Sequence, residues 1–282
     1  MSKLAQRLFI FLFGVPAVCA LVLLLPQLNH LALNLTIALF SAFSAVELSA
    51  MLAQRDLRLS KAKAAILGAL LPAAATVAML TGRASVPALA FFATTAGAGW
   101  LLLSRVFSKG EKLAAFSGEL VAGLCALLYP GAFLVWLVAM TGWGNSGVVI
   151  MAFLLAVFAG DSLAWALGML FGKNNRGLVP ASPNKSVAGF IGGLLGPAIV
   201  VAGAALIWPG IFAGSFARGA IVGLLTGCAA ILGDLAESAI KRSCGAKDSG
   251  KMMIGRGGFL DSMDSIAMAA PVFYLCFSAF FG

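Results

Sequence analysis

Two pairs of carboxylates near the end of the chain have a spacing that suits metal or phosphate chemistry. Asp234 and Glu237 are three residues apart, so on a helix they share one face, and Lys241 extends that face by one turn. Asp261 and Asp264 repeat the same spacing later in the chain. Brought together, the pairs would suit Mg²⁺, which takes a few carboxylates and keeps water or substrate phosphate as its other ligands. Spacing alone leaves open an alternative in which each pair is a helix-end charge balanced by nearby lysines.

The segment between the two pairs combines glycines with basic side chains. It reads KRSCGAKDSGKMMIGRGG over residues 241–258. Glycines let the backbone approach a ligand closely, and Lys247, Lys251 and Arg256 would neutralise phosphates. The segment contains neither a Walker loop nor a dinucleotide-binding glycine motif. It therefore predicts phosphate binding only as a generic pattern.

Other polar residues lie within or beside apolar stretches. Asp161 interrupts one such stretch, and Ser182 and Lys185 follow in a basic loop. An Asp at the centre of a membrane helix costs about 2.5–3.5 kcal/mol, so residues of this kind tend to line polar cavities. Glu47 and Glu119 are also embedded in apolar sequence, but they are isolated, and a structural role suits them at least as well as a catalytic one.

The composition indicates an integral membrane protein. The chain is 61% hydrophobic and only 10% charged, whereas soluble domains are about a quarter charged. Apolar stretches of about 20 residues predict an all-α, polytopic fold with about nine transmembrane helices. The first stretch resembles a signal peptide, but it is long for one, and an uncleaved first helix is the favoured interpretation. The predicted spans are 8–25, 31–52, 64–82, 86–104, 113–141, 147–171, 187–208, 217–239 and 265–281.

The placement of basic residues predicts the orientation of these spans. Tyr129-Pro130-Gly131 interrupts the segment 113–141, which is either one broken helix or two short ones. With a single crossing there, all 19 Lys and Arg residues except Arg83 and Arg218 share one side. Because cytoplasmic loops collect Lys and Arg, this side is the cytoplasmic one. We therefore expect an inner-membrane protein whose active site faces the cytoplasm.

The net charge of +9 suits anionic lipid headgroups or anionic substrates. Nucleic acid is a poor partner, because the basic residues lie in short loops without an aromatic-studded soluble domain. The chain divides into an N-terminal transmembrane region, 1–141, and a C-terminal catalytic region, 142–282. Closely spaced glycines predict close helix packing rather than a site; these are Gly189, Gly192, Gly193 and Gly196.

The C-terminal segments together resemble the signature of the phosphatidate cytidylyltransferases, also called CDP-diacylglycerol synthases. The resemblance covers about residues 155–270, and before that it is limited to general hydropathy. The matching residues are Ser238, Lys241, Arg242, Lys247, Asp248, Gly257, Gly258, Asp261 and Asp264, preceded by Asp161 and by Ser182-Pro183-Asn184-Lys185-Ser186. The chain departs from the family pattern at four positions, where it has Ala188, Ile254, Arg256 and Ser262.

The resemblance implies transfer of a cytidylyl group from CTP to phosphatidic acid, with Mg²⁺ as cofactor. In that interpretation Asp234, Asp261 and Asp264 hold the metal. The basic residues Lys241, Arg242, Lys247 and Lys251 bind the triphosphate or the leaving pyrophosphate. Asp161, Ser182 and Lys185 form the lipid-phosphate side, while Asp248 and Arg256 complete the substrate site, with Arg256 standing in for the family's histidine.

Two other classes of function stay open. The departures from the signature allow a non-catalytic paralogue that binds lipid or nucleotide. Intramembrane carboxylates also suit an ion-coupled transporter, although the sequence contains no visible repeat symmetry. Membrane lipids are expected partners in every case, and a homodimer is one oligomeric state that the sequence allows.

Overall fold

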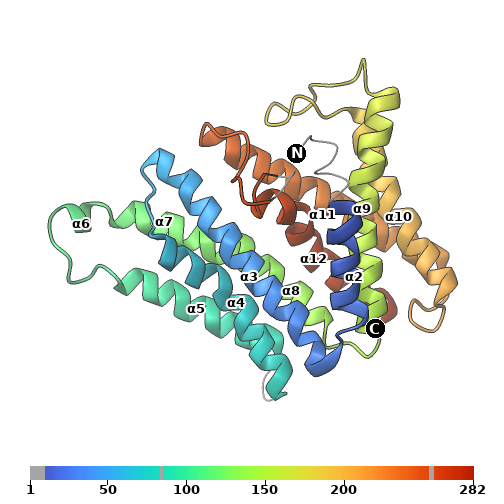
Figure 1. The fold of residues 1–282 in the computed structure, drawn as a ribbon, viewed down its shortest axis with the longest axis horizontal. Coiled ribbons are helices and arrows are strands. Elements are labelled where there is room, and N and C mark those ends of the chain that lie inside the picture. The colour runs from blue at the N-terminus through green and yellow to red at the C-terminus, as the bar shows by residue number, and fades with distance from the viewer. Residues whose placement is uncertain (1–9, 83–84, 254–256) are drawn as a thin grey trace. The chain divides into compact units, whose positions relative to one another are not determined.

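The computed structural model describes residues 10–82, 85–253 and 257–282. In this part of the chain the structure is helical, and its only β-type pairings are isolated bridges, from Arg176 to Ser186 and from Met253 to Gly257. The all-α prediction is confirmed (Figure 1). The elements are η1 (Ile10–Gly14), α2 (Val15–Leu23), α3 (Gln27–Leu52), η2 (Ala53–Arg55), α4 (Lys61–Thr81), α5 (Val86–Leu103), α6 (Glu111–Ala114), α7 (Phe116–Ala126), η3 (Leu127–Ala132), α8 (Phe133–Met140), α9 (Ser146–Phe171), α10 (Val187–Ile207), α11 (Phe216–Ser243) and α12 (Leu260–Phe281).

Eight of the described helical segments are long and apolar enough to cross a membrane, which identifies an integral membrane protein. They correspond to the second to ninth predicted spans. The first predicted span is represented by a shorter apolar helix, Leu12–Leu23. Residues 1–9 of the chain lie outside the described residues.

The interrupted fifth segment forms one continuous helical stretch, Phe116–Met140. Its middle turn, η3, is a π-helix that contains Pro130. Proline has no backbone N–H and crowds the preceding turn, and a wider π turn accommodates both effects without ending the helix. The segment is therefore one helix with an irregular turn at Pro130, as the first of the two interpretations expected, and not two short helices.

The chain folds into two compact units. The first runs to Gly142 and also takes in Ser243–Met263, and the second comprises Trp143–Arg242 and Asp264–Gly282. The first boundary lies next to the division predicted at residue 141. Ser243–Met263 groups with the N-terminal helices, and its contacts with α3 include those of Ser249, Phe259 and Leu260.

Glycines bring the helices of the second unit into close contact, as their spacing predicts. A Cβ on Gly196 would lie 2.6 Å from the carbonyl oxygen of Ala159, and one on Gly192 would overlap the backbone of Leu163. These contacts pack α10 against α9, and the two helices lie side by side (Figure 1). Gly227 on α11 packs in the same way against the backbone of α10 at Gly193.

Candidate functional site

One face of α11 carries a row of polar side chains. The Lys241 Nζ lies 2.5 Å from the Glu237 Oε2, an i, i+4 ion pair in which the Glu237 side chain is fully buried. The Ser238 hydroxyl donates to the Asp234 Oδ1 at 3.5 Å. The face that the sequence spacing predicts is therefore present, with Lys241 one turn beyond Glu237.

A lysine from the loop before α10 reaches this face. The Lys185 ammonium forms an ion pair with the Asp234 carboxylate. The next residue, Ser186, caps α10, since its hydroxyl accepts a hydrogen bond from the Gly189 N–H at 3.0 Å. The cap fixes where the loop ends and the helix begins, so it also fixes the base of the Lys185 side chain.

Asp264 on α12 joins the same group of charges. It is buried, and its Oδ1 accepts a hydrogen bond from the Ser265 N–H at 2.6 Å. Its carboxyl group interacts electrostatically with Asp234, Asp161 and Lys241. The second unit thus brings together five of the predicted site residues from α9, α11, α12 and the loop before α10.

Close packing between α11 and α12 brings Asp264 near Asp234. Gly233 lies against the backbone carbonyl of Asp264, and a Cβ there would be 2.8 Å from the Met268 Cβ. Because Asp234 follows directly in the chain, the contact holds the two aspartates near each other. Like charges repel in a medium of low dielectric, so the arrangement favours a bound cation or paired lysines.

The donor set suits a hard cation that is shared with phosphate. Among the described residues, no group of three or more His, Cys, Asp and Glu side chains is arranged to hold a metal ion by itself. Mg²⁺ is commonly held by one or two carboxylates together with substrate phosphates. Asp234 and Asp264 fit that mode, so they are suitable ligands for a metal that arrives with a nucleotide.

Asp261, the third predicted metal ligand, belongs to the first unit. Its Oδ2 accepts hydrogen bonds from the backbone N–H groups of Ser249 and Gly258, at 2.9 and 2.8 Å, and from the Ser249 hydroxyl at 2.9 Å. The carboxylate therefore organises the segment that precedes α12. Its role as a metal ligand stays a prediction.

Glu47 is the residue of this region that sequence reasoning missed. It lies on α3, it is 5% exposed, and its Oε2 accepts hydrogen bonds from the Leu260 N–H at 3.0 Å and the Ser249 hydroxyl at 3.2 Å. Its other oxygen, Oε1, has no hydrogen-bond partner among the described residues. The only signal in the sequence was a carboxylate inside an apolar stretch, which identifies a buried polar contact but not its partner.

Four of the remaining predicted substrate residues are exposed at the surface of their units. Arg242 belongs to the second unit, whereas Lys247, Asp248 and Lys251 belong to the first, and all four are exposed. Ser182 is half-buried in the second unit, and Arg256 lies outside the described residues. Their roles in binding substrate stay predictions.

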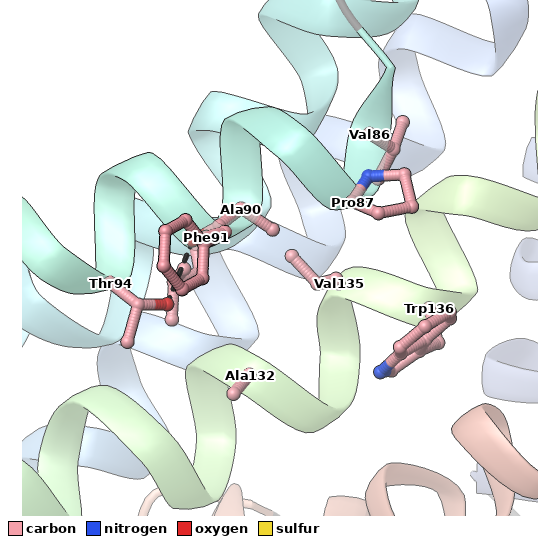
Figure 2. A pocket seen from close by; sticks show the side chains of 9 residues that line it. Val86, Pro87, Ala90, Phe91, Thr94, Ala132, Val135 and Trp136 are labelled. Carbon is pink, nitrogen blue, oxygen red and sulfur yellow. Dashed lines mark hydrogen bonds between the residues drawn. The ribbon is translucent and has the colours of Figure 1, made fainter.

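Two further features belong to the first unit alone. Glu119 is buried and forms ion pairs with Lys63 and Arg105, the latter at 2.6 Å, which gives it a structural role. A separate pocket, lined mostly by apolar side chains of α5 and α8, includes Phe91 and Trp136 (Figure 2). The hydroxyl of Thr94 in this pocket donates to its own helix, so the lining offers little to bind a phosphate (Figure 2).

Comparison with known proteins agrees with the signature in the sequence. The profile of the cytidylyltransferase family matches residues 5–280. The chain is 36% identical to the uncharacterized protein YnbB of Escherichia coli over 133 residues, which cover 46% of this chain and 43% of that protein. It is 41% identical to a phosphatidate cytidylyltransferase of Synechocystis over 129 residues, 45% of this chain and 42% of the relative. A phosphatidate cytidylyltransferase of Brucella abortus is 34% identical over 209 residues, 67% of this chain and 75% of the relative. The chain thus spans less than half the length of the first two relatives and three quarters of the third.

Proposed function

The chain belongs to the cytidylyltransferase family, and from this premise we propose that it transfers a cytidylyl group from CTP to phosphatidate. The products are CDP-diacylglycerol and pyrophosphate, and the reaction serves phospholipid biosynthesis. A phosphate oxygen of the lipid forms a bond to the α-phosphorus of CTP. The bond from that phosphorus to the bridging oxygen breaks, and its electron pair leaves with pyrophosphate.

One observation carries the proposal: in the second unit Lys185 pairs with Asp234, and Asp264 lies within electrostatic range of Asp234, Asp161 and Lys241. These residues come from separate parts of the chain, and each belongs to a segment that matches the family signature. The arrangement combines carboxylates with lysines among helices long and apolar enough to cross a membrane. This combination suits a reaction in which several phosphates must be held together at a membrane.

The chemistry needs charge compensation and alignment more than it needs a base. The attacking group is already a phosphate oxyanion, so no strong general base has to remove a proton from it. This agrees with a chain that contains a single histidine. Lysines that neutralise the phosphates, and residues that hold them in line, would supply most of the rate enhancement.

Mg²⁺ is the cofactor that this donor set fits. Asp234 and Asp264 would hold it, with Asp261 as the third ligand expected from the signature. When bound, the metal would offset charge on the phosphates and help to orient them. Lys185, which pairs with Asp234, would neutralise a phosphate held at the same site.

Different side chains would bind the two substrates. Lys241, Arg242, Lys247 and Lys251 would bind the triphosphate and the leaving pyrophosphate, and Asp248 and Arg256 would complete that site. Asp161, Ser182 and Lys185 would contact the phosphate of the lipid. CTP and phosphatidate are thus the expected partners, and a homodimer is an oligomeric state that the proposal accommodates.

The basic loops also support an orientation. We expect the protein to reside in the inner membrane with its site facing the cytoplasm, because cytoplasmic loops collect Lys and Arg and CTP is a cytoplasmic substrate. Trypsin cleavage within the loop 173–185, which contains Lys173 and Arg176, in sealed inverted vesicles but not in intact spheroplasts would support this orientation. The reverse pattern would contradict it.

The direct test is turnover by the purified full-length chain. Labelled CTP, phosphatidate in mixed micelles and Mg²⁺ should give a labelled CDP-lipid and pyrophosphate. The variant Asp264→Asn should lose at least a hundred-fold in rate, the order of magnitude that a misplaced catalytic group costs. A matched control is Asp56→Asn, which changes an 89% exposed carboxylate at a left-handed position that Asn also tolerates.

Several outcomes would contradict the proposal. CTP binding without any product would indicate a non-catalytic paralogue. Ion flux in proteoliposomes that lack nucleotide would indicate a transporter. Full activity of Asp264→Asn, with Asp56→Asn also unchanged, would remove the aspartate cluster from the mechanism.

A further inference from the structure

The segment that joins α11 to α12 is attached to one face of α3. Phe40, Phe43 and Glu47 are spaced by three and four residues, so they lie along one side of that helix. Phe259 lies near the end of the segment. The centroid of its ring is 5.0 Å from the ring centroid of Phe40 and 4.9 Å from that of Phe43. Phe259 therefore packs on the turn of α3 that precedes Glu47.

The Glu47 carboxylate fixes the start of α12. Its Oε2 accepts a hydrogen bond from the Leu260 N–H at 3.0 Å, and Leu260 is the first residue of that helix. The first N–H groups of a helix have no partner within the helix, and a negative charge is favourable at this end. Glu47 thus satisfies a group that the helix cannot satisfy itself, from a position more than 200 residues away in the chain.

The same carboxylate explains two glycines of the segment. A Cβ on Gly250 or on Gly258 would overlap the Glu47 carboxylate, so no larger residue fits at either position without displacing it. The sequence alone suggested that these glycines let the backbone approach a phosphate. In the structure they let the backbone approach Glu47.

Ser249 connects Glu47 to the signature aspartate. Its hydroxyl lies 3.2 Å from the Glu47 Oε2 and 2.9 Å from the Asp261 Oδ2. A hydroxyl has one proton, so it donates to one of these carboxylates at a time. Glu47, Ser249 and Asp261 therefore form one hydrogen-bonded unit within the segment.

The other end of the segment is attached to the same helical stretch. The Arg55 Nε donates to the backbone carbonyl of Ser243 at 2.6 Å. Arg55 ends η2, which directly follows α3. Contacts from α3 and η2 thus hold the segment where it begins and where it ends, while Lys247 and Lys251 remain exposed between them.

We propose that Glu47 is a positioning residue for the nucleotide site: through Ser249 and Leu260 it holds the segment on either side of Lys251 in the conformation that presents Lys247 and Lys251 to the triphosphate. This role rests on the proposed function, because it is the nucleotide that the two lysines would meet. It assigns a task to an N-terminal helix that lies outside the recognisable signature. It also predicts that the loss of Glu47 acts mainly on the binding of CTP.

The test compares Glu47→Ala with Glu47→Gln in the full-length protein. Alanine removes the acceptor, and KM for CTP should rise about tenfold with a smaller change in kcat, the effect expected from losing one charge-assisted hydrogen bond. Glutamine keeps an oxygen that can accept from the Leu260 N–H, so it should restore part of the affinity. Ser249→Ala gives a second variant in case Glu47→Ala does not fold, and it should raise KM in the same direction.

A second measurement does not depend on activity. Amide hydrogen exchange over residues 249–260 should accelerate about tenfold in Glu47→Ala, because the Leu260 N–H loses its acceptor and the segment opens more often. The matched control is Glu119→Gln, which alters another buried carboxylate of the first unit that does not contact this segment. Its exchange over 249–260 and its KM for CTP should equal those of the wild type.

The outcomes separate the two proposals. Unchanged exchange and unchanged KM in Glu47→Ala and Ser249→Ala would overturn the positioning role. A wild-type protein that forms no CDP-lipid would instead overturn the proposed function, and the exchange data would still decide whether Glu47 holds the segment. Equal acceleration in Glu119→Gln would show that the effect is general destabilisation, which also overturns the positioning role.

Discussion

Replacement of Gly233 by alanine is the sharpest test of the aspartate cluster. Gly233 lies where α11 meets α12, and the added methyl group would be 2.8 and 3.0 Å from the Cβ and Cγ of Met268 and would overlap the carbonyl oxygen of Asp264. Real Cβ atoms do not approach neighbouring atoms this closely, so α12 has to move. Because Asp234 follows Gly233 directly and Asp264 itself makes the contact, we expect the displacement to change the separation of the two carboxylates.

The size of the effect follows from the overlap. Inserting a methyl group into a packed interface costs about 1–3 kcal/mol of stability. A shift of about 1 Å in a reacting group costs roughly a hundred-fold in rate. We therefore expect Gly233→Ala to fold with reduced thermal stability. It should retain about one per cent of the wild-type rate of CDP-lipid formation.

The assay measures initial rates with labelled CTP beside thermal unfolding in detergent. The control is Gly203→Ala on α10, where an added Cβ meets no heavy atom within 4 Å. In a helix interior this change should be neutral or stabilising by up to about 1 kcal/mol, with no loss of activity. Wild-type activity in Gly233→Ala would refute the reasoning that close contact between α11 and α12 holds the two aspartates together.

Three further predictions concern charge. Lys185→Ala should reduce activity by at least tenfold because it removes the partner of Asp234. Restored activity in Lys185→Arg would show that the positive charge is what matters. Initial rates at varied phosphatidate concentrations measure the activity of both variants. Glu119→Ala should lower stability by about 3 kcal/mol in thermal or denaturant unfolding, because Lys63 and Arg105 lose their shared partner, and an unchanged transition would contradict its structural role. Chelation of divalent cations should abolish turnover and added Mg²⁺ should restore it, so activity that survives exhaustive chelation would exclude Mg²⁺ as the cofactor.

Hydropathy predicted most of the membrane architecture. A helix needs about 20 apolar residues to satisfy its backbone across a bilayer, so eight of the nine predicted segments appear as span-length helices among the described residues. The first segment is shorter, as Leu12–Leu23. Local periodicity was equally informative on α11, where the spacing predicted that Glu237 and Lys241 lie on one face, and the structure contains an ion pair between them.

The hydrogen-bond partners of the buried Glu47 carboxylate could not be predicted from the sequence around it. Glu47 looked isolated because Ser249 and Leu260 follow it by more than 200 residues. Its contact depends on how α3 packs against a segment with no regular periodicity. Likewise, the glycines of that segment suggested phosphate binding by type, but the Glu47 carboxylate is what they accommodate.

The sequence by itself determined that this is a helical membrane protein with a cytidylyltransferase signature, because apolar length and residue spacing along one helix are local properties of the chain. Only the tertiary structure decided that Lys185 meets Asp234, that Asp264 joins them, and that Glu47 holds the segment before α12. Those contacts arise from close packing between helices, which depends on the shapes of surfaces distant in sequence and has no counterpart in the pattern of any single segment.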